Sequence, residues 1–441
     1  MIQLSDHFDY KHLLRYTFPS VIMLVFTSVY GVVDGFFVSN YAGKTPFAAV
    51  NFIMPLLMIL GCVGFMFGTG GGALIAITMG AGRTGKANEL FSLIVYVSAA
   101  CGVLLAVLGF VFLRPIASLM GAQGQLLEDC MVYGRIILAA IPFYVLQYEF
   151  QCLFATAGKP KFGLFVTVAA GVTNILLDAL FVAGFRWGLE GAAAATAFSQ
   201  FVGGVIPLVY FGRKNGSSLR LVKCGFDGRA LGKVCVNGSS ELMSNISMSL
   251  VSMVYNIQLM KYAGEDGVAA YGVLMYVGMI FQAVFIGYSV GAAPVFGYHY
   301  GAQNHEELKG LLKKSIALVS VFAVLMFGSG QMLSGSLSRL FVGYDAGLFE
   351  MTVHAFTVFS FSFLFSGYAI FGSSFFTALG DGVVSAVISF LRTLVFQCLS
   401  VLLFPLIWKL DGIWFSIVAA EIMAVGVTVL FLIGKRRKYR Y

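Results

Sequence analysis

Runs of apolar residues longer than 18 recur along the whole sequence, and they constrain the fold more than any other feature. A run of that length can cross the hydrocarbon core of a bilayer as a helix. Charged residues make up only 11% of the 441 residues, whereas soluble domains carry about 25%. The sequence therefore predicts an all-α polytopic membrane protein with no room for a separate soluble domain.

Twelve segments are long and apolar enough to be transmembrane helices. They lie near residues 13–39, 47–79, 90–114, 131–156, 162–185, 190–211, 232–260, 268–297, 311–335, 350–378, 383–408 and 412–434. Of the 28 lysine and arginine residues, twenty then fall on one side of the membrane and six on the other. Because basic residues concentrate in cytoplasmic loops, this bias predicts a multi-pass protein of the cell inner membrane with both termini in the cytoplasm.

A shift of 221 residues places the first half of the sequence on the second. It superimposes Gly80-Ala81 on Gly301-Ala302, Met54 on Met275, Tyr41-Ala-Gly43 on Tyr262-Ala-Gly264, and Trp187-Gly-Leu-Glu-Gly191 on Trp408-Lys-Leu-Asp-Gly412. The repeat predicts two pseudo-symmetric six-helix bundles, 1–212 and 232–441, joined by a basic cytoplasmic linker at 213–231. Parallel repeats of this kind usually enclose a central cleft and give alternating access by rocking.

Two carboxylates in the first half lie at membrane depth and form the candidate ion site. Asp34 is in the first predicted helix with Tyr30 four residues earlier, and Asn174 and Asp178 share a face of the fifth. Thr196 adds a hydroxyl from the sixth helix. A carboxylate at mid-bilayer costs roughly 2.5–3.5 kcal/mol, so it is a functional candidate by default. These oxygen donors suit Na⁺ or a proton shared between two acids; a hydrogen-bond network that only joins helices is the alternative.

The candidate substrate-binding residues come from other predicted helices. Glu241 and Asn245 belong to a polar stripe on the seventh helix, and such a stripe faces a wet cavity or a partner helix. Met54, Met275 and Gln282 are placed with them, because methionine suits adaptable binding surfaces, although ordinary packing is the better explanation of each methionine taken singly. Pro19 is the candidate hinge of the first helix, since proline removes a backbone hydrogen bond.

Three further charged residues at membrane depth are open to a functional or a structural interpretation. Glu149 and Glu421 are buried-acid candidates, and Arg392 is expected to form an ion pair with Glu421 or with Glu241. The sequence has no CxxC, HExxH, Walker A or G-x-S-x-G motif, so we expect no cofactor and no enzyme activity. The net charge of +8 is explained by cytoplasmic loops rather than by nucleic-acid binding.

Taken together, these features resemble the multidrug and toxic compound extrusion (MATE) transporters over the whole chain. The resemblance rests on the twelve helices in two halves, on Gly80-Ala81-Gly82 with Gly301-Ala302-Gln303, and on Pro19, Tyr30, Asp34, Asn174, Asp178 and Thr196. The chain resembles the prokaryotic branch of these transporters. This resemblance implies that Asp34, Asn174, Asp178 and Thr196 bind the cation or proton beside Tyr30. It also implies export of amphipathic, often cationic, drugs in exchange for Na⁺ or H⁺.

We therefore expect a secondary antiporter that binds small molecules, contacts membrane lipid and is a monomer. One alternative is a lipid-linked oligosaccharide flippase of the same superfamily, whose cleft should be strongly cationic to hold phosphates. The predicted membrane-depth charges are mostly acidic and argue against it. A second alternative, an intramembrane enzyme or receptor, needs a catalytic pair or a soluble ligand-binding part, and the sequence displays neither.

Overall fold

The computed structural model describes residues 3–42 and 44–441, and within these ranges the regular structure is entirely helical. Short π-helical segments follow or interrupt some helices. In the first half the elements are α1 (Tyr10–Phe37), η1 (Val38–Ala42), α2 (Lys44–Gly80), α3 (Thr84–Leu119), α4 (Gly124–Thr156), α5 (Pro160–Asp178), η2 (Ala179–Gly184) and α6 (Gly188–Gly212). In the second half they are α7 (Gly228–Gly301), α8 (His305–Val342), α9 (Ala346–Ser360), α10 (Phe363–Ala378), α11 (Gly382–Phe390), η3 (Leu391–Val395), α12 (Phe396–Leu403) and α13 (Pro405–Tyr439).

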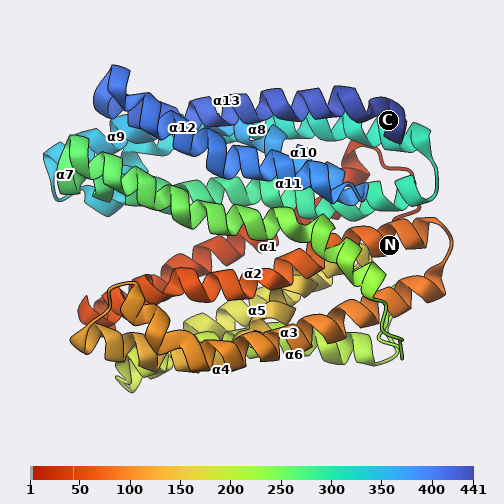
Figure 1. The fold of residues 1–441 in the computed structure, drawn as a ribbon, viewed down its shortest axis with the longest axis horizontal. Helices are drawn as coiled ribbons and strands as arrows, with labels where there is room; N and C mark the ends of the chain where they lie inside the picture. The colour runs from red at the N-terminus through yellow and green to blue at the C-terminus, as the bar shows by residue number, and fades with distance from the viewer. Residues whose placement is uncertain (1–2, 43) are drawn as a thin grey trace.

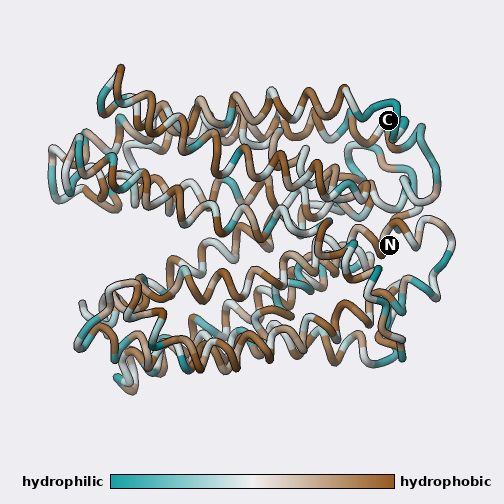
Figure 2. Tube along the Cα trace, in the orientation of Figure 1, coloured by the Kyte–Doolittle hydropathy of each residue, from teal (hydrophilic) through white to brown (hydrophobic). Residues whose placement is uncertain are grey.

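Polar residues just before several helices explain where these helices begin. Asp9, Asp227, Asn304, Asp345 and Asp381 each precede a helix and accept a hydrogen bond from a backbone N–H of its first turn. Such caps satisfy donors that have no partner inside the helix. The apolar side chains occupy the length of the helices, and hydrophilic residues gather at the two ends of the molecule (Figure 2).

The described helices account for the twelve predicted membrane crossings. Ten are long and apolar enough to span a bilayer on their own, and α9 with α10 forms an eleventh span bent by 49°. α7 has 74 residues, which is about 110 Å of helix and far more than one crossing needs. Gly264 interrupts it with φ 64° and ψ −150°, so α7 supplies two crossings. The bend inside the predicted 350–378 span was not expected.

The helices form two groups, with α1–α6 in one and α7–α13 in the other, and both termini lie at one end (Figure 1). We call this the terminal end, and the opposite one the far end. The 221-residue repeat recurs in the backbone, because Gly82 and Gln303 both adopt positive φ, as do Gly188 and Lys409. The predicted Gly43 copy of Gly264 lies outside the described residues.

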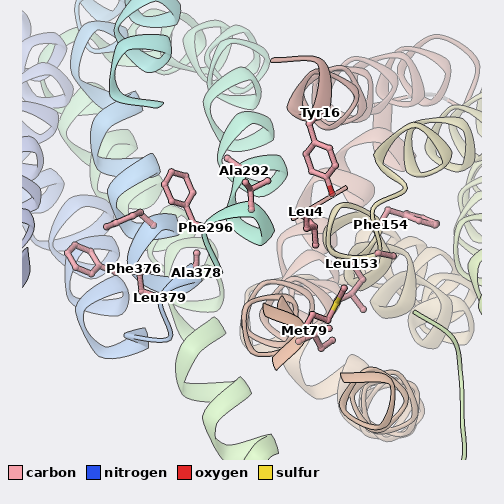
Figure 3. Packing of buried hydrophobic residues seen from close by; sticks show 14 of the residues in the cluster. Leu4, Tyr16, Met79, Leu153, Phe154, Ala292, Phe296, Phe376, Ala378 and Leu379 are labelled. Carbon is pink, nitrogen blue, oxygen red and sulfur yellow. The ribbon is translucent and has the colours of Figure 1, made fainter. Parts of the chain in front are cut away.

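Buried apolar residues of the two groups pack together at the terminal end, and a smaller cluster that includes Met23 and Ala283 continues this contact along α1 and α7. One core cluster there draws on both halves, with Tyr16 and Met79 from the first and Phe296 and Phe376 from the second (Figure 3). Toward the far end the halves have separate cores, one formed by residues between Val38 and Ala193 and the other by residues between Val251 and Val418. The space between the halves is therefore closed at the terminal end.

Two repeat-equivalent glycines allow a very close approach of α2 and α7 in this closed end, and we call this contact the glycine seam. A Cβ added at Gly80 would lie 1.9 Å from the carbonyl oxygen of Tyr298, and one added at Gly301 would lie 2.1 Å from that of Ile77. Both contacts are to backbone, where no side chain can move aside. The ends of α2 and α7 can meet here only because neither position carries a side chain.

The segment before α1 fastens the first half to the second at the same end. The Phe8 side chain is fully buried and packs edge-to-face on Tyr16 of α1 and His299 of α7. The backbone N–H of Phe8 donates to Glu307 Oε1 at 3.0 Å, and its carbonyl accepts from Lys314 Nζ; both partners belong to α8. The terminal end is thus held by polar contacts as well as by its apolar core.

A second polar cluster at the terminal end centres on Asp381, between α10 and α11. Its carboxylate accepts from Tyr439 Oη at 2.6 Å and from Val384 N–H at 3.4 Å, and Lys435 and Lys438 both lie 3.7 Å away. Burial alone would raise the pKa of Asp381, but the bonds from Tyr439 and Val384 and the two lysine charges outweigh burial and hold the pKa below its ordinary value. The ionised carboxylate therefore ties the end of α13 to the start of α11.

Candidate functional site

Three of the predicted ion-site residues form a chain of contacts across α1, α5 and α6. Thr196 Oγ1 lies 3.4 Å from Asp34 Oδ1 and donates to it, and Asn174 Nδ2 lies 3.5 Å from Thr196 Oγ1. Asp34 is 9% exposed and Asn174 is 1% exposed. Both contacts are long for hydrogen bonds, so these oxygens are not saturated by the protein. The three helices place the amide, the hydroxyl and the carboxylate side by side.

Asp178 completes this group from the last position of α5, where the helix passes into the π-helical η2. The side chain is fully buried, and neither carboxylate oxygen has a hydrogen-bond partner in the described structure. The Asp34 and Asp178 carboxyl groups lie near enough to influence each other electrostatically. Two carboxylates that meet in a buried site need a proton or a cation between them. Helices one and five thus carry their acids on the same side of the first half, and the binding of an ion between them stays a prediction.

Other buried oxygens near the pair are free to bind the same ion. Asn174 Oδ1 and Gln200 Oε1 are both buried and have no hydrogen-bond partner among the described residues. With the two carboxylates and the Thr196 hydroxyl, they form a set of oxygen donors of the kind that hard cations prefer. Donors of this kind suit Na⁺ and a shared proton equally well.

Two tyrosines flank the site, and sequence reasoning found only one of them. Tyr30 lies on the cleft side and interacts with Asp34 and with Gln147 of α4, as its i,i+4 spacing to Asp34 suggests. Tyr133 of α4 is fully buried, its hydroxyl has no bonded partner among the described residues, and it lies within reach of Asp34, Asp178 and Thr196. Nothing in the sequence separates Tyr133 from the other 19 tyrosines, because its role depends on how α4 packs.

A cavity of about 660 Å³ separates the two halves and is lined by both. All five residues proposed to bind substrate line it, namely Glu241, Asn245, Met54, Met275 and Gln282. Asp34, Asn174 and Thr196 line the same cavity, whereas Asp178 does not. An ion that enters from the cleft would therefore meet Asp34 before it reaches Asp178. Pro19 lies buried within α1, which continues as a helix beyond it, and its hinge role stays a prediction.

The remaining charged residues separate into a cleft pair and an isolated acid. Arg392 of η3 forms the predicted ion pair with Glu421 of α13, at 2.9 Å from Nε to Oε2. Both residues line the cavity. Glu149 is fully buried, is not part of the cavity lining, and accepts a hydrogen bond from Ser98 of α3. The expectation of an Arg392 ion pair is confirmed for Glu421.

Membrane-spanning helices around a cleft, with two buried carboxyl groups beside it, are an architecture typical of membrane transporters. The chain belongs to the MatE family, whose model matches residues 19–180 and again residues 242–402. The multidrug export protein MepA of Staphylococcus saprophyticus subsp. saprophyticus is 24% identical over 442 residues, which cover 97% of this chain and 94% of MepA.

Solved structures of MATE proteins share the fold over the full length. A MATE protein in complex with MaL6 superimposes with a TM-score of 0.93 at 22% identity, covering 98% of both chains. An outward-facing multidrug resistance MATE family transporter of the MOP superfamily gives 0.92 at 23% identity, covering 98% of this chain and 97% of the other.

Proposed function

We propose that this protein is a secondary antiporter that exports amphipathic, cationic drugs or metabolites in exchange for H⁺ or Na⁺. The buried Asp34 carboxylate in the cavity wall, with Thr196 and Asn174 beside it, carries the proposal, because it gives an ion a place to bind next to the space that holds the cargo. The name of the relative MepA, a multidrug export protein, agrees with this class of cargo.

In this proposal the ion and the cargo are coupled because they compete for the cavity wall that the first half of the chain forms. An ion at Asp34 and Asp178 removes negative charge from the wall that Asp34 lines, and the affinity for a cationic cargo falls. Thermodynamic linkage requires the converse, so that cargo binding weakens ion binding by the same factor. The residues proposed to bind the ion are Asp34, Asn174, Asp178 and Thr196, with Tyr30 and Tyr133 beside them.

The charge of the cavity wall argues against the flippase alternative. Among the described residues, the charged side chains of the lining are Asp34, Glu241, Glu421 and Arg392. Three acids and one arginine do not form the cationic surface that a lipid-linked phosphate needs. An amphipathic cation matches the same wall in both charge and hydrophobic lining.

The remaining parts of the proposal concern orientation and assembly. With both termini in the cytoplasm, as the basic loops predict, the terminal end is cytoplasmic and the cleft is closed to the cytoplasm. We place the protein in the cell inner membrane as a monomer. We further propose that residues 1–212 and 232–441 move as two bundles joined by the 213–231 linker, with bending of α1 at Pro19.

The test is efflux of a fluorescent amphipathic cation from proteoliposomes, with a Na⁺ gradient and a pH gradient imposed separately. Wild-type protein should respond to one of them, and Asp34→Asn should lose that response. Asp266→Asn is the matched control, because Asp266 is an exposed aspartate next to the break in α7. Gradient-driven efflux by Asp34→Asn at the wild-type rate would refute the assignment of the ion site.

A further inference from the structure

The charges of the cleft are divided unevenly between its two walls. The first-half wall carries Asp34, whose charge is neutralised whenever the proposed ion is bound. The second-half wall carries Glu241 of α7, Arg392 of η3 and Glu421 of α13. The charge of the second-half wall does not depend on whether an ion is bound. It is therefore the constant part of the electrostatic environment of a bound cargo.

Arg392 and Glu421 neutralise each other through a two-pronged contact. Arg392 Nε lies 2.9 Å from Glu421 Oε2 and Nη2 lies 2.9 Å from Oε1. The two side chains are 14% and 3% exposed, so water screens the pair little. Arg392 lies in the π-helical segment η3, and π-helical turns are frequent at functional sites.

Glu241 is the carboxylate on this wall that has no such partner. It takes part in none of the ion pairs formed by the described residues, although the positive charge of Arg392 acts on it. Both oxygens of Glu421 accept hydrogen bonds from Arg392, through Nε and Nη2. Among the described residues, Arg392 therefore forms its ion pair with Glu421 rather than with Glu241.

We propose that Arg392 is a specificity-determining residue that sets the charge of the exported molecule. By neutralising Glu421, it leaves Glu241 as the one uncompensated acid of the second-half wall, so that this wall matches one positive charge of an amphiphile. This inference rests on the proposed export function and names the cargo more closely. Removing Arg392 would add one negative charge to the cleft, and removing the charge of Glu421 would release Arg392 to neutralise Glu241.

The size of the effect follows from one unit of charge at the distance of a bound cargo. We compare two cargoes that differ by one unit of charge and lie about 10 Å from the altered side chain. With an effective dielectric constant of about 20, one added charge in the wall changes the ratio of their affinities by a factor on the order of ten. The two single variants should shift this ratio in opposite directions. A role of the ion pair in stability alone would not produce opposite shifts.

The experiment uses three probes with the same aromatic body that carry no charge, one quaternary ammonium or two. Arg392→Gln, Glu421→Gln and the double variant are purified, and both binding and proteoliposome efflux are measured for each probe. Arg392→Gln should raise the preference for the dication over the monocation about tenfold. Glu421→Gln should favour the neutral probe. The double variant should restore the wild-type ratios, since it replaces a charged pair by a neutral one.

The double variant also guards against a folding artefact, because exchanging both partners of a buried ion pair is tolerated better than removing one. Unchanged ratios in both single variants, shifts in the same direction, or a double variant unlike wild type would overturn the proposal while leaving export intact. If wild-type protein neither binds nor exports any of the three probes, the proposed function fails and this inference fails with it.

Discussion

The glycine seam makes a quantitative prediction about the closed terminal end. A Cβ at position 301 would lie 2.1 Å from the Ile77 carbonyl oxygen and 2.8 Å from both the carbonyl carbon and Cα of Ile77. Since a tolerable contact is about 3.4 Å, Gly301→Ala requires the backbones of α2 and α7 to separate by about 1 Å or more. Overpacking of this kind costs about 1–3 kcal/mol.

This penalty applies only in the state in which the two helix ends touch. Gly301→Ala should therefore reduce the closed population relative to the open one by about 5- to 150-fold, as 1–3 kcal/mol implies. The measurement is pulsed electron paramagnetic resonance between spin labels at Arg83 and Lys309, two exposed positions at the terminal end of different halves. The variant should populate longer distances than the wild-type protein.

Two further glycine variants make the experiment decisive. Gly80→Ala should act like Gly301→Ala, because it occupies the equivalent position in the repeat and would meet the Tyr298 carbonyl. Gly85→Ala is the control, since no atom lies within 4 Å of an added Cβ at that position. If Gly301→Ala kept the wild-type distances while folding normally, the seam would not determine closure and the reasoning would be wrong.

Three more predictions concern the polar clusters of the terminal end. Tyr439→Phe should lower the unfolding free energy by about 1.5–3 kcal/mol, the range for a hydrogen bond to a charged partner, as measured by chemical denaturation in detergent. Because folding lowers the pKa of Asp381, its contribution is present above the pKa of the unfolded carboxyl and is lost as the pH falls through the folded pKa. Asp381→Asn should lose less stability on acidification than wild type, and parallel pH curves would contradict this. Glu307→Gln should lengthen the spin-label distances because it weakens the hold on Phe8, whereas Glu306→Gln, an exposed neighbour, should not.

The overall arrangement of the helices was predictable because it follows from periodic features of the sequence. Apolar runs and the 221-residue repeat predicted the twelve crossings and the two groups of helices, and a single offset also relates Gly80 to Gly301. That Arg392 would pair with a carboxylate was predictable from the high energy of an unpaired charge in a membrane, whereas the choice of Glu421 over Glu241 was not. The exact division of the chain into bundles at 213–231 and the functions of the site residues stay predictions.

Features that depend on packing were not predictable from the sequence. Tyr133 reaches the ion site because α4 lies against α1 and α6, and no local pattern records that contact. The bend between α9 and α10 and the π-helical segment that carries Arg392 are likewise responses of a helix to its neighbours. The sequence also gives no sign that Phe8, in a polar stretch, is buried against the second half.

The anchoring of Phe8 has a consequence for biosynthesis. Its partners Glu307 and Lys314 follow about 300 residues later in the chain, so they do not exist when the first six helices enter the membrane. At about 5–20 residues per second, the ribosome needs roughly 15–60 s to reach α8. For that interval the leading segment of the nascent first half lacks its partners in the second half and can pack only against its own half, as Phe8 does on Tyr16.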